Sequence, residues 1–114
     1  MCLLCRKNII SNKDLNRKVI KLVHKIEHQF NPSKIILFGS LSQGRSHELS
    51  DLELIIVGQF NVPFFKRIGL ILNLNDTDLE VDPLVYTEEE FARMLDEDNF
   101  FIINAIKEGT EIQE

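Results

Sequence analysis

The sequence predicts an α/β domain, in the broad sense that includes α+β, with a small mixed β-sheet flanked by helices. Its length of 114 residues suits one hydrophobic core. Apolar residues recur at helical spacing in some segments, and in others they alternate with polar residues or run together. These segments follow one another in the order helix, strand, strand, helix, strand, helix, helix. Residues 1–114 are therefore expected to form a single domain with its core at about residues 13–110.

The first element is an amphipathic helix from about residue 13 to residue 29. Its basic residues and two histidines fall on one face, and a stripe of apolar residues occupies the other: Leu15, Val19, Leu22, Val23, Ile26 and Phe30. Pro32 ends this helix, because proline disfavours helical geometry in the residue before it. The apolar run from Lys34 to Phe38 then predicts a buried strand, which Gly39 and Ser40 close.

The second strand is predicted over residues 51–57. Because side chains alternate along a strand, Asp51 and Glu53 project from one face. The other face of this strand is apolar and consists of Leu52, Leu54 and Ile56. This strand therefore brings two carboxylates to the same side of the sheet.

A second amphipathic helix is predicted over residues 64–74, followed by a third strand over residues 79–86. Asp82 lies on this third strand. Pro83 has no amide hydrogen to donate, which predicts that the strand lies at a sheet edge or loses pairing nearby.

Two helices complete the chain. Thr87 with Glu90 forms a capping-box pattern that opens a helix ending near residue 96. The last helix runs from about residue 99 to residue 108, with Gly109 as its C-terminal cap. It is apolar nearly all round, which predicts either deep burial or an interface with a partner, the two being almost equally favoured. An interface here is compatible with a homo-oligomer.

Composition and charge exclude several classes of protein. The net charge of −5 combines +6 over residues 1–50 with −11 over residues 51–114. No segment approaches the roughly 18 consecutive apolar residues of a membrane span, and the N-terminus lacks a signal-peptide pattern. Two cysteines are too few for a disulfide scaffold, so a reducing cytoplasm is expected. Nucleic-acid binding is not expected, because the basic helix face lacks interleaved aromatic residues and the whole chain is acidic.

Three carboxylates form the candidate site: Asp51, Glu53 and Asp82. Neighbouring strands lie about 4.8 Å apart, so these oxygens can converge, and magnesium is the usual counter-charge for such a group. For the carboxylates alone, a merely solvated face is the favoured interpretation. Gly39 and Ser40 add a turn whose backbone amides suit phosphate, and ten residues separate this turn from Asp51.

This pattern resembles the minimal nucleotidyltransferases of the DNA polymerase beta superfamily. The shared features are the strand ending in Gly39-Ser40, the ten-residue spacing, the Asp51-Leu52-Glu53 triplet and a later aspartate, Asp82. Residues 86–91 and 106–109 also resemble the tail segments of such proteins. The similarity covers about residues 13–110 and implies the nucleotidyltransferase fold.

The resemblance implies a nucleotidyl transfer. An NTP, commonly ATP, would place its phosphates on Gly39 and Ser40, and two Mg²⁺ ions would be held by Asp51, Glu53 and Asp82. The third carboxylate would help to activate an acceptor hydroxyl, which attacks the α-phosphorus and expels pyrophosphate. Glu53 stands where aspartate is commoner in the family. Its side chain is longer by one methylene, about 1.5 Å, so ligation requires a folded-back rotamer.

Minimal nucleotidyltransferases are typically antitoxins that act beside a helical HEPN protein. The resemblance therefore implies transfer of AMP onto a tyrosine of such a toxin. Two alternatives stay open: a degenerate site that neutralises the partner by binding alone, and nucleotidylation of a small molecule.

Cys2 and Cys5 with His24 and His28 resemble a zinc pattern, but the 18 intervening residues exceed the usual spacing, so zinc is not expected.

Overall fold

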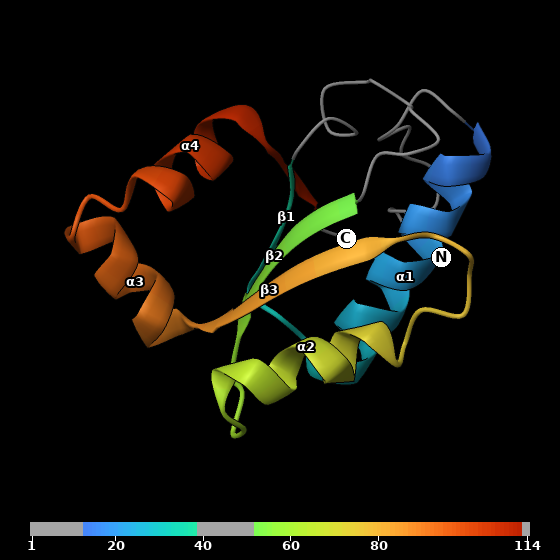
Figure 1. Cartoon of the computed structure of the whole chain (residues 1–114), viewed down its shortest axis with the longest axis horizontal. Coiled ribbons are helices and arrows are strands. Elements are labelled where there is room, and N and C mark those ends of the chain that lie inside the picture. Colours follow the sequence, from blue (N-terminus) through green and yellow to red (C-terminus); the bar gives the residue numbers. More distant parts are fainter. Residues whose placement is uncertain (1–12, 39–51, 113–114) are drawn as a thin grey trace.

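A four-stranded mixed sheet with strand order β3-β2-β1-β4 forms the centre of the computed structural model, which describes residues 13–38 and 52–112. Helices cover both faces of the sheet (Figure 1). The elements in chain order are α1 (Lys13–Phe30), β1 (Lys34–Phe38), β2 (Leu52–Gly58), α2 (Phe64–Leu72), β3 (Val81–Thr87), α3 (Glu88–Asp96), α4 (Phe100–Glu108) and β4 (Thr110–Ile112). This architecture confirms the predicted α/β fold with its small mixed sheet.

The sheet combines two kinds of pairing. β1 pairs antiparallel with β2 on one side and with β4 on the other, whereas β2 and β3 are parallel. Parallel neighbours need a crossover connection, and α2 lies within it. β3 is an edge strand, which confirms the position that Pro83 predicted.

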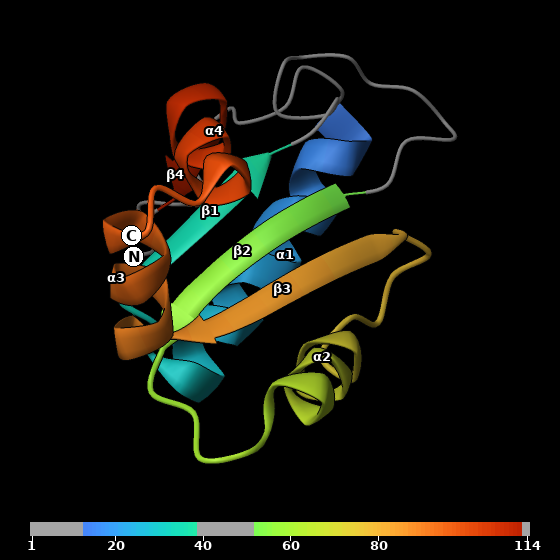
Figure 2. The same ribbon diagram turned by 60° about the vertical axis from the view of Figure 1, so that its left-hand side comes forward.

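Each face of the sheet has its own hydrophobic cluster. Alternate residues such as Ile35, Leu54 and Val85 pack with α1 and with Ile71 of α2. The residues between them pack with α3 and α4: Ile36, Ile55 and Val57 contact Phe91, Ile102 and Ala105. Figure 2 shows α3 and α4 on one side of the sheet and α1 on the other. Because both faces are covered, β2 is apolar along its length except at Glu53.

Two predicted boundaries differ from the structure, and one strand was not predicted. β3 begins at Val81 rather than near residue 79, and α2 ends at Leu72 rather than near residue 74. The side chain of Asn75 explains both changes, because its Nδ2 donates to the Leu79 carbonyl oxygen at 2.7 Å and its Oδ1 accepts from the Thr77 amide. These local hydrogen bonds favour a turn over helix or strand. The short strand β4 was missed, because three residues are too few to show alternation.

α3 begins at the capping box that the sequence predicted. The Thr87 hydroxyl oxygen accepts from the Glu90 amide at 3.1 Å, and the Glu90 carboxylate accepts from the Thr87 amide at 2.8 Å. The box satisfies two backbone amides that the helix itself cannot pair. Among the described residues, no helix is long and apolar enough to cross a membrane.

Arg67 lies in α2 and joins this helix to β3 and α3 from a buried position. Its side chain is 7% exposed, and its Nε donates to the Val62 carbonyl oxygen at 2.9 Å. Its Nη1 donates to the Val85 carbonyl oxygen at 3.2 Å and to Glu90 Oε1 at 2.6 Å. Burial raises the pKa of Glu90, but the hydrogen bonds from Arg67 and Thr87 outweigh it and hold that pKa below its usual value.

Gly109 follows α4 as its C-terminal cap, at the position that the sequence predicted. Its φ of −83° is an ordinary value, so a left-handed conformation is not the reason for glycine here. The reason is space, because a Cβ atom would lie 2.5 Å from the Ala105 carbonyl oxygen and 2.8 Å from Ile36 Cγ2. Gly109 therefore lets the chain pass close to β1 before it enters β4.

Replacing Gly109 by alanine is expected to lower the free energy of unfolding by roughly 1–3 kcal/mol, because backbone atoms must move away from the new Cβ. Gly69→Ala is the matched control, since a Cβ at this position in α2 meets nothing within 4 Å. That change is expected to stabilise the helix by about 0.5–1 kcal/mol. Urea denaturation measures both, and equal effects of the two variants would contradict the steric account.

Candidate active site

Two of the predicted site residues, Glu53 and Asp82, lie side by side on neighbouring strands. Glu53 on β2 is the register partner of Asp82 on β3. Register partners project from the same face, and adjacent strands lie about 4.8 Å apart. Glu53 is half-buried and Asp82 is exposed. The parallel pairing of β2 with β3 therefore places one carboxylate next to the other.

The remaining predicted site residues, Gly39, Ser40 and Asp51, lie outside the described residues. Their chain neighbours are placed: Phe38 ends β1 and Leu52 begins β2. Phe38 is the register partner of Glu53, so both of these strand ends belong to the same end of the sheet as the carboxyl pair.

An aromatic wall borders the carboxyl pair on the side of β1. Phe38 packs edge-to-face against Phe101 of α4, with ring centroids 5.4 Å apart and an interplanar angle of 78°. Apolar neighbours lower the local dielectric constant, which strengthens the attraction between a carboxylate and a cation. This wall could not be predicted from the sequence, because nothing in the spacing of Phe38 and Phe101 links them.

The donor set of the pair fits a hard divalent cation. Glu53 and Asp82 offer carboxylate oxygens from two rigid elements, and such oxygens are the ligands that Mg²⁺ prefers. Among the described residues, no group of three or more His, Cys, Asp or Glu side chains could hold a metal ion. The third predicted ligand, Asp51, precedes β2 directly in the chain.

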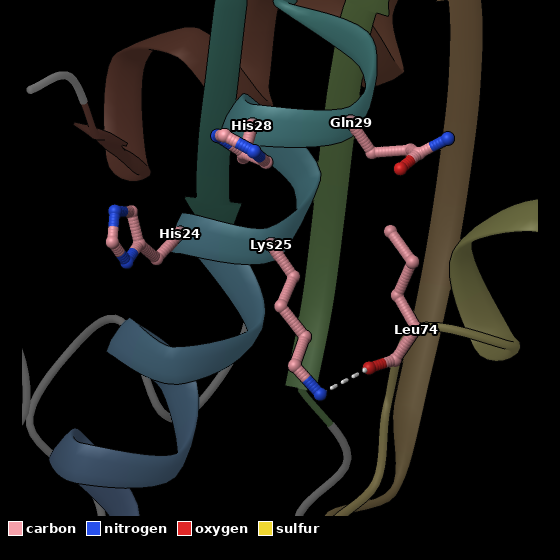
Figure 3. A pocket seen from close by; sticks show the side chains of 5 residues that line it. All are labelled: His24, Lys25, His28, Gln29 and Leu74. Atoms are coloured by element: carbon pink, nitrogen blue, oxygen red, sulfur yellow. Dashed lines mark hydrogen bonds between the residues drawn. The ribbon is translucent and has the colours of Figure 1, made fainter.

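A separate open pocket of about 370 Å³ lies beside α1, lined by His24, Lys25, His28, Gln29 and Leu74. Figure 3 shows the two imidazoles on one side of the helix, while the Lys25 ammonium donates to the Leu74 carbonyl oxygen at 3.3 Å. α1 covers the face of the sheet opposite to Glu53. This pocket is therefore not part of the carboxyl site, and Cys2 and Cys5 lie outside the described residues.

Comparisons with known proteins agree with the fold. The family model described as polymerase beta, nucleotidyltransferase, matches residues 20–114. A crystal structure of a Sulfolobus solfataricus protein with a provisional nucleotidyltransferase assignment superposes with a TM-score of 0.52, covering 68% of this chain and 70% of that one. The two sequences are 22% identical, so this likeness concerns the fold alone. No curated protein is significantly similar to the chain.

Proposed function

Because this chain belongs to the polymerase beta nucleotidyltransferase family, we propose that it transfers AMP from ATP to a hydroxyl acceptor in a Mg²⁺-dependent reaction. Nucleotidyltransferases of this superfamily generally use a divalent metal and a nucleoside triphosphate. The observation that carries the proposal is the direct pairing of Glu53 with Asp82 across β2 and β3.

The carboxylates would hold the metal, and the turn before them would hold the nucleotide. Glu53 and Asp82, with Asp51, would bind Mg²⁺, which supplies charge stabilisation at the phosphates. The backbone amides at Gly39 and Ser40 would donate to phosphate oxygens. The strands fix the two carboxylates relative to each other. The two carboxylates would therefore contribute to the reaction by positioning and by electrostatic stabilisation.

The chemical step forms one bond and breaks another. The acceptor hydroxyl oxygen bonds to the α-phosphorus of ATP, and the bond from this phosphorus to the oxygen bridging to the β-phosphorus breaks. Pyrophosphate leaves with that electron pair. Asp82, the exposed member of the pair, takes the proton of the hydroxyl.

The acceptor that we propose is a tyrosine of a helical HEPN partner, with this chain acting as its antitoxin in the cytoplasm. The resemblance to minimal nucleotidyltransferases supports this choice. A second candidate is neutralisation by binding alone, which the longer side chain of Glu53 and the exposed apolar side of α4 favour.

Incubation with α-labelled ATP, Mg²⁺ and a HEPN-type helical protein from the same genome tests the proposal. We expect label on a tyrosine of the partner, no label after addition of EDTA, and no label with Asp51→Asn. A stable complex without label would support neutralisation by binding alone. Label on small hydroxyl compounds, but not on the protein, would contradict the choice of acceptor.

A further inference from the structure

α4 leaves part of its apolar surface exposed. Ile102 and Ala105 are its buried residues. Phe100 is 82% exposed, and three more large apolar side chains are about two-fifths exposed: Phe101, Ile103 and Ile106. We call these four residues the α4 surface. With 100° between successive residues, Phe100 and Ile103 point outward, while Phe101 and Ile106 flank the buried stripe.

This surface adjoins the carboxyl pair. Phe101 contacts Phe38, and Phe38 is the register partner of Glu53, which is in turn paired with Asp82. Figure 2 shows α4 next to β1, on the same side of the sheet as α3. A protein seated on the α4 surface would therefore lie beside the residues that we assign to the transfer reaction.

Exposed acidic residues lie at both ends of the α4 surface: Asp96, Glu97 and Asp98 precede the helix, and Glu108 is its last residue. Residues 88–111 hold eight Asp and Glu but two basic residues, Arg93 and Lys107. Glu90 and Glu111 form ion pairs with Arg67 and Lys34, so they are not counted in this acidic rim. Three of the acids, Asp96, Glu97 and Asp98, lie between α3 and α4 or at the end of α3, and all three are exposed. In a symmetric dimer the same patch meets itself, so two copies docked here would bring these negative charges together.

From the apolar centre and the acidic rim, we propose that the α4 surface binds the acceptor protein through an apolar helix face flanked by Lys or Arg. This inference rests on the proposed function, because it names the kind of partner whose hydroxyl reaches Glu53 and Asp82. The exposed aromatic ring of Phe100 is the expected anchor, since aromatic residues dominate binding energy at such interfaces.

The probe is a synthetic peptide of about 18 residues with a leucine stripe flanked by lysines, long enough to form a helix on binding. Fluorescence anisotropy without ATP measures its affinity. We expect Phe100→Ser and Ile103→Ser each to weaken binding at least about tenfold. Phe65→Ser is the matched control, because Phe65 is 72% exposed on α2, and it should leave the affinity unchanged.

Two further peptides isolate the two chemical requirements. A peptide of the same composition in scrambled order loses the apolar stripe, and a version with glutamates in place of the lysines loses the charge complementarity. Both are expected to bind at least about tenfold more weakly than the probe. Circular dichroism shows whether each protein variant is folded, and two independent single variants keep the test decisive.

Several results would overturn the docking surface. These are equal binding of the scrambled peptide, equal loss with Phe65→Ser, or a wild-type dimer that Phe100→Ser dissociates. Because binding is measured without ATP, an inactive carboxyl site leaves the result unchanged. Label transfer by a chain that does not bind the peptide would overturn this inference alone.

Discussion

Replacing Glu53 by glutamine is expected to lower the rate of nucleotidyl transfer at least about a hundredfold. Glutamine keeps the length and shape of the side chain but removes its negative charge. Of the two paired carboxylates, only Asp82 on the neighbouring strand would then carry a negative charge to hold the cation. The initial rate of label transfer from α-labelled ATP measures the effect, and Asp82→Asn is expected to act in the same direction.

Two other variants sharpen this test. Asp78→Asn is the control, because Asp78 precedes the same strand but forms an ion pair with Lys18 on α1 at 2.5 Å, away from the carboxyl pair. It should keep the wild-type rate. Glu53→Asp restores the commoner family residue and should keep measurable transfer. A wild-type rate in Glu53→Gln would exclude Glu53 from the reaction.

Replacing Arg67 by alanine is expected to lower the free energy of unfolding by about 3 kcal/mol. The change removes the donor to two backbone carbonyl oxygens, those of Val62 and Val85, and leaves Glu90 without its cation. Urea denaturation at neutral pH measures the loss. Arg93→Ala, an exposed arginine of α3, is the control and should change stability by less than about 0.5 kcal/mol.

The same network predicts a pH dependence. The pKa of Glu90 is below its usual value in the folded protein. The ionised Glu90 carboxylate therefore stabilises the fold fully at any pH above the pKa that this group has in the unfolded chain, and this stabilisation weakens below it. It is lost as the pH falls through the lower, folded-state value. Arg67→Ala should therefore lose less stability than the wild type between neutral and acidic pH. An identical loss in both proteins would show that the ion pair with Arg67 does not control this titration.

The sequence predicts the elements of this fold well where a local signal exists. Thr87 marks the start of α3, and Pro83 places its strand at a sheet edge. The sequence does not predict a feature whose cause is a contact with residues far away in the chain. β4 depends on its pairing with β1, and the burial of Arg67 depends on acceptors from β3 and α3.

The candidate site shows the same division. The alternation around Glu53 and the position of Asp82 could be read from the sequence, but their register could not, because it depends on how β2 and β3 align. Phe101 could not be foreseen as a neighbour of the site. Its contact with Phe38 follows from the path of α4 over β1, which the close approach at Gly109 allows.

The strand order also has a consequence for solubility. An open sheet edge is a template for aggregation, because its unpaired backbone groups can join a strand of another chain. One edge of this sheet carries Pro83, which cannot donate a backbone hydrogen bond, and the other is β4, which has three residues. Both edges are therefore poor templates for strand addition. Edge-to-edge β-pairing through the described strands is therefore disfavoured, so within residues 13–38 and 52–112 the helices are the better surfaces for contact with other proteins.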